Sequence, residues 1–305
     1  DATKGWLPLE DDVVADEPVA PPTQKGIFGY GTTGSLVSLT NLVNSSGVIA
    51  SDVTGVGTAR RYLTAASYGV DKAIFAYGYT ADAYSSLSNL VSNSGVVATD
   101  TTGVGTARAD PAAAKYGGDK AIVGYGNGNK SMTNLVSSSG VVSSDVTGVG
   151  TGRSNLGAAG YGVDKALFGY GTTGSYVSLT NLVSNSGVVA TDTTGVGTAR
   201  YGCRAAEYGV GLAIFAYGYV SGWVSMSNLV NSSGVVSSDV SGVGTARAVA
   251  ATSYGGDKAI FGYGTNGSAV SMSNLVNNVG TVASDVTGVG TARYHLAAAG
   301  YSITA

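Results

Sequence analysis

Cysteine and histidine are almost absent from this sequence, which holds one residue of each among 305. A disulfide bond within the chain is therefore excluded, and a zinc site that needs several His and Cys ligands cannot be assembled. Charged residues make up 11% of the chain, less than half of their usual share, and the net charge is −3. We expect no nucleic-acid partner, because this net negative charge does not attract phosphate. We also expect no metal and no cofactor.

Proline is also scarce, and long apolar runs are missing. Five prolines without a Gly-X-Y period exclude collagen. No stretch approaches the roughly 18 uncharged apolar residues that a membrane-spanning helix needs, so we expect no membrane insertion. The chain begins with Asp1 and not with Met, so we expect that an N-terminal piece is missing or has been removed.

Glycine, in contrast, is abundant, and three short glycine-flanked or apolar strings recur six times in a fixed order. The 48 glycines are roughly twice the ordinary share. The first string, of the type K-A-I-F-G-Y-G, begins at Lys25, Lys72, Lys120, Lys165, Leu212 and Lys258. The second, N-L-V, begins at Asn41, Asn89, Asn134, Asn181, Asn228 and Asn274. The third, G-V-G-T-[AG]-R, ends at Arg60, Arg108, Arg153, Arg200, Arg247 and Arg293.

Each repeat spans 45 to 48 residues and holds four short apolar segments separated by turn residues. None of these segments is long enough for a helix. Four strands per unit of this length is typical of a propeller blade, so the sequence predicts an all-β, six-bladed β-propeller over residues 25–305. We expect the aromatic residues of the second strand, such as Phe75 and Tyr77, to lie on one face and fill the gap between blades.

The two ends of the repeat array predict closure of the ring. The chain enters the array at a second strand, residues 25–31, with no small-residue strand before it. After Arg293 it continues through Tyr294 and His295 into the small-residue run 296–301. We expect this C-terminal run to supply the missing first strand of the N-terminal blade, which removes open sheet edges.

The repeat resembles that of the kelch family of propellers. In that family a T-A-R phrase precedes a small-residue strand and then an aromatic strand that ends in glycines. Here Thr58-Ala59-Arg60, Ala65-Ala66 and Ile74-Phe75-Ala76-Tyr77-Gly78 occupy those places. The family's double glycine becomes Gly-Tyr-Gly, and its late tryptophan is replaced by Gly47-Val48-Ile49. The phrase G-V-V-x-x-D-x-x-G-V-G-T-A-R is also similar to glycine-rich kelch-like arrays in virion and tail-fibre proteins of tailed bacteriophages.

Several patterns suggest chemistry but have a simpler structural interpretation. The string G-V-G-T-A-R is not a phosphate loop, because it occurs six times and no helix follows it. An Asp stands eight residues before each repeated Arg, as Asp52 does before Arg60. These aspartates suggest calcium ligands or a charged ring, but we favour a structural turn with the Arg paired nearby. The kelch family includes copper-radical oxidases, whose ligand set cannot be built from His295 and Cys203 alone, so we expect no enzyme.

The six units differ mainly in two sets of connections, those after Gly-Tyr-Gly and those after Thr-Ala-Arg. Both leave from the same face of an antiparallel four-stranded blade, so the differences gather on one face of the disc. Tyr, Trp, Asn and Arg suit recognition and stacking on sugars. The candidate ligand- or receptor-binding residues are Tyr62, Tyr79, Tyr84, Asn129, Tyr176, Tyr201, Arg204, Tyr219, Trp223, Tyr294 and His295. The second set also includes Arg61, Asp110, Pro111, Lys115, Asn155 and Glu207. Neutral drift of exposed loops remains the alternative.

Residues 1–24 do not belong to the repeat and predict an extended acidic arm. They carry six acidic residues against one lysine, and four prolines exclude a regular helix. We expect this arm to dock onto neighbouring subunits or other virion proteins, with folding back onto its own propeller as the alternative. The apolar anchors that we expect there are Trp6, Leu7, Leu9, Val13 and Val14.

Together, these observations predict a non-enzymatic structural or adhesion protein of a tailed bacteriophage, on the virion surface or otherwise extracellular. Its loop face would bind a host glycan or another surface receptor, and its arm would anchor it. One alternative is a structural subunit of an extracellular fibre or surface layer. A second alternative is a secreted lectin-like propeller.

Overall fold

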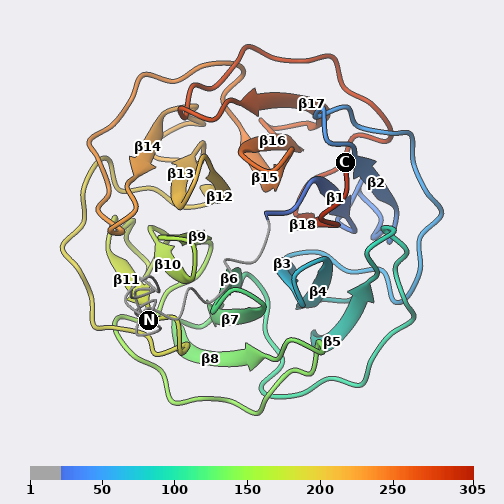
Figure 1. Ribbon diagram of the computed structural model, residues 1–305, viewed down its shortest axis with the longest axis horizontal. Coiled ribbons are helices and arrows are strands. Elements are labelled where there is room, and N and C mark those ends of the chain that lie inside the picture. Colours follow the sequence, from blue (N-terminus) through green and yellow to red (C-terminus); the bar gives the residue numbers. More distant parts are fainter. Residues whose placement is uncertain (1–21) are drawn as a thin grey trace, which may run out of the picture.

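The computed structural model describes residues 22–305, which form strands and turns and contain no helix. The strands build six three-stranded antiparallel sheets, arranged in a ring around a central axis (Figure 1). The sheets, each given from its innermost strand outward, are β18 (Ala297–Tyr301), β1 (Lys25–Gly29), β2 (Thr40–Val43); β3 (Thr64–Tyr68), β4 (Lys72–Tyr79), β5 (Tyr84–Val91); β6 (Ala112–Tyr116), β7 (Lys120–Gly126), β8 (Lys130–Val136); β9 (Gly157–Tyr161), β10 (Lys165–Gly169), β11 (Thr180–Val183); β12 (Arg204–Tyr208), β13 (Leu212–Ala216), β14 (Ser227–Val230); and β15 (Ala248–Tyr254), β16 (Lys258–Thr265), β17 (Ala269–Val276).

The first and last strands of the described chain share one sheet. β18 pairs antiparallel with β1, so that Tyr301 lies opposite Lys25 and Ala297 lies opposite Gly29. The other five sheets are each built from strands that are consecutive in the sequence. The innermost strands β18, β3, β6, β9, β12 and β15 contact one another in turn around the axis (Figure 1).

Each sheet has three strands and not the four that the sequence predicts. The outer segment of the first unit makes only two isolated bridges to β2, Val43 with Ile49 and Thr40 with Val53. The two bridges differ by one residue in register, so a regular backbone ladder cannot run through both. Between them, the Asn41 Nδ2 donates a hydrogen bond to the Ala50 carbonyl oxygen at 3.0 Å.

Aromatic side chains of β4 and its equivalents fill the gaps between sheets, but they do not share one face as predicted. Phe75 packs against Tyr30 of the preceding sheet, with ring centroids 5.1 Å apart. Tyr77 packs into the opposite gap, against Val123. Tyr77 has φ 61°, a left-handed conformation that turns its side chain away from the face of Phe75. Gly29 is required by the close approach, since a Cβ there would lie 2.6 Å from Phe75 Cζ.

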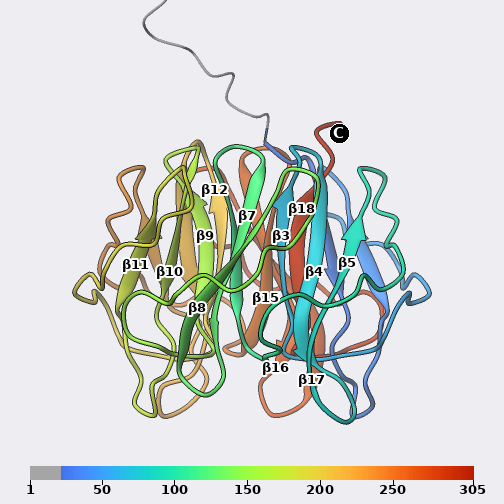
Figure 2. The same ribbon diagram turned by 90° about the horizontal axis from the view of Figure 1, so that it is seen from below.

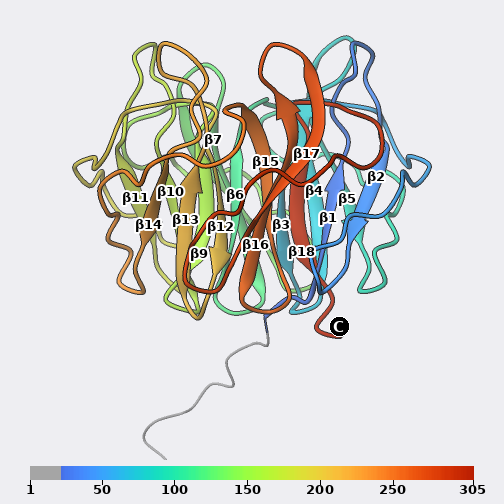
Figure 3. The ribbon, with the colours of Figure 1, turned by 90° about the horizontal axis from the view of Figure 1, so that it is seen from above.

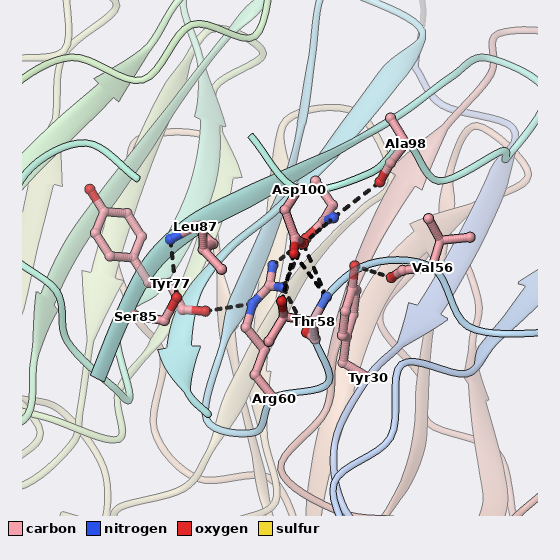
Figure 4. Close-up of polar contacts among 10 residues, drawn as sticks. Tyr30, Val56, Thr58, Arg60, Tyr77, Ser85, Leu87, Ala98 and Asp100 are labelled. Atoms are coloured by element: carbon pink, nitrogen blue, oxygen red, sulfur yellow. Dashed lines mark hydrogen bonds and ion pairs between the residues drawn. The ribbon is translucent and has the colours of Figure 1, made fainter. Parts of the chain in front are cut away.

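A fully buried arginine links each pair of neighbouring sheets (Figure 4). The guanidinium carbon of Arg60 lies 4.5 Å from the ring centroid of Tyr30, in the preceding sheet. Its Nε donates to the Tyr77 carbonyl oxygen at 2.9 Å, and its Nη2 donates to Asn89 Oδ1 at 2.6 Å, both in the following sheet. The stacking on a tyrosine ring and the Nε bond recur at all six arginines. We call this arrangement the arginine latch.

The repeated aspartates complete the latch by joining one unit to the preceding one. Asp100 accepts hydrogen bonds from the backbone N and the Oγ1 of Thr58 and from Asn89 Nδ2 (Figure 4). Its partner arginine is Arg60, at 3.9 Å, and not the arginine eight residues later. Asp52 makes the same contacts with Thr291 of the last unit. The structural interpretation is thus confirmed, although the bonds run between units and not within a turn. Residues 22–305 contain no group of three His, Cys, Asp or Glu side chains that could hold a metal ion.

Candidate recognition site

The two sets of variable connections lie at the same end of the ring, which we call the loop end. Isolated bridges join them in pairs, with Arg61 opposite Tyr79, Tyr201 opposite Tyr219, and Thr32 opposite Tyr294. The opposite end, the turn end, carries the short hairpins such as Gly69–Asp71 and the C-terminus (Figure 2). Figure 3 shows the same separation, with the long β16–β17 hairpin and the C-terminus at opposite ends of the axis.

A rim of unlike residues surrounds the axis at the loop end, two positions after each latch arginine. Each rim residue has a positive φ, between 53° and 68°. Backbone hydrogen bonds connect several neighbours: Tyr62 N donates to the His295 carbonyl oxygen, Asp110 N to that of Tyr62, and Gly202 N to that of Asn155. The rim comprises Tyr62, Asp110, Asn155, Gly202 and His295.

The sixth sheet, β15–β17, contributes no such rim residue. Seven positions separate Arg247 from Tyr254, whereas eight separate Arg60 from Tyr68, so this unit is one residue shorter at the rim. β15 begins at Ala248, directly after the latch arginine. The rim is therefore interrupted at one of its six places.

One aromatic cluster covers the loops of the β9–β11 and β12–β14 sheets. Tyr201 lies at its centre, with its ring centroid 5.1 Å from Tyr176 and 5.4 Å from Tyr219. Trp223 packs edge-on against Tyr219 at 5.1 Å. Tyr176 is 39% exposed, so the cluster is open to solvent. Four predicted site residues from two units are thus brought together.

A second aromatic cluster lies over two neighbouring sheets, that of β18, β1 and β2 and that of β3, β4 and β5. The His295 ring stacks on Tyr62 with centroids 4.0 Å apart and contacts Tyr294 at 4.7 Å. The Arg61 guanidinium carbon lies 5.2 Å from the Tyr62 ring centroid and 5.7 Å from that of Tyr79. Tyr84, which is 51% exposed, packs against Tyr79 with centroids 5.4 Å apart.

The centre of the rim brings together ionisable groups of both signs. Burial and the nearby positive charges of Arg204 and Arg61 lower the pKa of His295 to about 3, so its imidazole is neutral at pH 7. Burial raises the pKa of Asp110 to about 6, although the charges of the same two arginines oppose this shift. Burial also raises the pKa of the Tyr62 phenol, helped by the nearby Asp110 carboxylate. Arg204 donates from Nη1 to the carbonyl oxygens of Cys203 and Leu156 at 3.0 and 3.4 Å.

Asn129 stands apart from both aromatic clusters. It lies in the connection between β7 and β8, and its Nδ2 donates to the Thr173 carbonyl oxygen at 3.0 Å. It therefore supports the neighbouring loop that carries Tyr176.

Two of the variable residues expected on the loop face lie elsewhere. Lys115 in β6 and Glu207 in β12 line an axial cavity of about 190 Å³, which also touches Pro22 and Val210 at the turn end. The interpretation of both as loop-face residues is wrong, because each directly precedes the tyrosine that ends its innermost strand, at the turn end. Cys203 is fully buried among Tyr170 and Phe215, at the position that Leu63 and Leu156 occupy in other units.

Three residues of the site were not selected from the sequence as candidates: Arg61, Asp110 and Asn155. Each was recognised as variable, but a sequence does not show which variable loop positions turn toward the axis. The signal that would have found Asp110 and Asn155 is the fixed spacing of two residues after the latch arginine, because Asn, Asp and Gly are the residues that best tolerate a left-handed backbone.

The expected arm anchors Trp6, Leu7, Leu9, Val13 and Val14 lie outside the described residues. The last residues of the expected arm belong to the turn end: Gln24 N donates to the Ser302 carbonyl oxygen, and Gly255 N donates to that of Gln24. No helix within residues 22–305 is long and apolar enough to cross a membrane. No protein-family model and no curated protein matches this chain.

Proposed function

We propose that this chain is a closed, six-bladed kelch-like propeller that serves as a non-enzymatic adhesion protein on the virion of a tailed bacteriophage. Its loop end binds a host-surface glycan or another receptor. Residues 1–24 anchor it to neighbouring subunits or other virion proteins. The pairing of β18 with β1 and the cyclic contacts of the innermost strands support the closed propeller.

The observation that carries the adhesion proposal is the gathering of variable aromatic residues at one end of the axis. Tyr176, Tyr201, Tyr219 and Trp223 come from three connections in two units, yet they form one solvent-accessible cluster. Flat aromatic rings stack on sugar rings with little loss of conformational entropy. Drift alone gives no reason for aromatic residues from two units to gather at one place.

The position of the chain ends supports an anchored protein. Lys25, where β1 begins, lies opposite Tyr301, at the same end of the ring as the C-terminus (Figure 2). The aromatic cluster belongs to the connections of the loop end, where Tyr201 is bridged to Tyr219. A protein held through a segment preceding Lys25 would therefore present its loop end outward. The virion assignment itself rests on the resemblance of the repeat phrase to phage arrays.

A glycan-binding screen tests the adhesion proposal. We expect the wild-type protein to bind a defined set of host-surface glycans, and the double variant Trp223→Ala/Tyr219→Ala to lose this binding. The matched control is Val163→Ala/Val210→Ala, which removes two exposed apolar side chains at the turn end and leaves binding unchanged. If the wild-type protein binds no glycan and no host cell, the structural-subunit alternative is favoured.

Truncation tests the anchoring role. Removal of residues 1–21 spares Thr23 and Gln24, which hydrogen-bond at the turn end. We expect a folded protein that no longer assembles with its partner proteins, and sedimentation reports both properties. Assembly that is unchanged by the truncation contradicts the anchoring role.

A further inference from the structure

The centre of the loop end carries an excess of positive charge. Arg61 lies over the Tyr62 ring, which stacks on His295, and the Tyr62 carbonyl oxygen accepts a hydrogen bond from Asp110 N. The charges of Arg61 and Arg204 both act on His295 and on Asp110. Among the charged residues of the described chain, neither arginine has a carboxylate within ion-pair distance. This differs from four latch arginines, each of which lies 3.7 to 4.0 Å from an aspartate oxygen.

Two buried polar atoms in this centre lack a hydrogen-bond partner within residues 22–305. They are the Nε of Arg61 and the Oδ1 of Asp110. Buried polar atoms are almost always paired, so the unpaired donor of Arg61 points to a partner that arrives from outside the chain. An N–H of a guanidinium group is a suitable donor to an anionic oxygen.

A small cavity of about 40 Å³ lies beneath the rim, between the innermost strands. Its lining is formed by small and apolar residues such as Ala205, Pro111 and Leu296, and Arg204 is its one charged member. The cavity is large enough for a small group or a water molecule and too small for a whole sugar ring. A charged substituent could therefore enter while the rest of a ligand stays outside the rim.

We propose that the rim centre is a subsite for the anionic group of a charged saccharide, held by Arg61 and Arg204. This inference rests on the proposed adhesion function and specifies its ligand class. The second aromatic cluster includes the rim residues Tyr62 and His295, and the first centres on Tyr201, which directly precedes the rim residue Gly202. Both clusters receive the sugar rings. A carboxylate and a phosphate share the chemistry that two guanidinium groups recognise, and the experiment distinguishes them.

Isothermal titration calorimetry on the full chain tests the subsite with three probes: oligogalacturonate for a carboxylate, oligo(ribitol phosphate) for a phosphate, and maltoheptaose as the neutral saccharide. We expect one anionic probe to bind at least ten times more tightly than maltoheptaose. Arg204→Gln and Arg61→Gln each raise the Kd of that probe tenfold or more. Arg204→Lys restores part of the affinity, because it keeps the charge and loses the planar fork.

Two matched variants exclude a general charge effect. Lys165→Gln removes one positive charge at the turn end, and we expect it to change the Kd less than twofold. Asp110→Asn removes the one carboxylate of the rim centre, and we expect it to tighten binding of the anionic probe. Circular dichroism of each variant shows that the fold is retained.

The outcomes separate this subsite from the adhesion function. Equal affinity for maltoheptaose and the anionic probes, an equal effect of Arg204→Gln and Lys165→Gln, or no binding of either anionic probe each overturns the subsite. If glycan or host-cell binding is still lost in Trp223→Ala/Tyr219→Ala, the adhesion function stands without it. If the wild-type protein binds neither glycans nor host cells, both proposals are wrong.

Discussion

The latch arginines and the rim residues lie two positions apart in the sequence, yet they follow opposite rules. Arg60 and its five equivalents are identical and fully buried, and each bridges two sheets. The rim residues two positions later are all different and partly accessible, with the exception of the buried Gly202. Because the latch contacts recur in every unit, the packing of neighbouring sheets does not depend on the residues of the following loop. The loop residues immediately after the latch arginine can therefore vary.

The same contrast holds for charge. A latch arginine is surrounded by a fixed set of acceptors, namely a tyrosine carbonyl oxygen, a threonine carbonyl oxygen and, at four of the six positions, an asparagine Oδ1. Arg61, one residue after Arg60, instead stacks on Tyr62 and Tyr79 and has a free Nε among the described residues. The first arginine has its donors occupied within the fold, and the second leaves one donor for the proposed ligand.

The largest expected effect comes from removing a latch arginine. Arg60→Met leaves the Asn89 Oδ1 and the Tyr77 carbonyl oxygen buried without their donor. We expect a loss of about 3–5 kcal/mol in the free energy of unfolding, as is typical when one member of a buried polar pair is removed. Arg61→Met is the control and should cost less than about 1 kcal/mol. Urea denaturation measures both, and equal losses would contradict the division between latch and rim.

A smaller effect distinguishes two copies of the latch. The Asn89 Oδ1 accepts from Arg60, whereas the Asn41 Oδ1 has no partner among the described residues. The Nδ2 bonds of the two asparagines are the same in kind. We therefore expect Asn89→Ala to cost more than Asn41→Ala by about 1.5–3 kcal/mol, the contribution of a hydrogen bond to a charged group.

Comparison of the two midpoints in urea gives this difference directly. If the two variants lose the same free energy of unfolding, the latch is energetically equivalent at both positions. The absence of an arginine hydrogen bond to Asn41 Oδ1 would then not affect stability.

The rim should also give the stability of the protein a pH dependence with two opposing parts. The pKa of His295 is about 3 in the folded state, below the ordinary value of 6.5. The unfolded chain therefore takes up this proton first, and the stability falls as the pH drops from about 6.5 to 3. The pKa of Asp110 is about 6, above its ordinary 3.8, so the folded state takes up that proton first. The stability then rises as the pH drops from about 6 to 4.

Each part can be removed separately. His295→Gln should abolish the loss of stability at low pH, which we expect to be on the order of 1–2 kcal/mol. Asp110→Asn should raise the free energy of unfolding at pH 7, also by on the order of 1–2 kcal/mol. Both effects stay this small because partial exposure screens the charges. Thermal unfolding between pH 4 and pH 8 measures both curves. Curves of wild type and variants that stay parallel would show that the rim groups are not perturbed as described.

The sequence predicted the three paired strands of each sheet, though not the loss of the fourth, because each repeat reports on the same structure six times. The hairpin that brings Tyr68 opposite Lys72 and the pairing of residues 297–301 with β1 follow from spacing alone. The reversed side chain of Tyr77 does not, since a left-handed tyrosine is an exception to strand alternation that depends on the latch around it. The rim centre was also not predictable, because Arg61 and Arg204, whose charges act on Asp110, belong to separate units.

The smallest effect tests the division between fixed and variable residues within a single loop. Tyr217 and Tyr219 are two residues apart, and the hydroxyl group of each donates to a carbonyl oxygen, that of Val243 at 3.3 Å and that of Ser221 at 3.4 Å. The Tyr217 side chain is fully buried, so Tyr217→Phe leaves an acceptor with less access to water and should cost about 1 kcal/mol. Tyr219→Phe lies in the exposed loop and should change the stability by less than about 0.5 kcal/mol. Both substitutions remove the same hydroxyl oxygen, so urea denaturation compares them directly. A larger loss in the free energy of unfolding for Tyr219→Phe would show that the variable loop, and not the buried tyrosine, has the structural role. The variability of the aromatic cluster would then have no explanation in this division between fixed and variable residues.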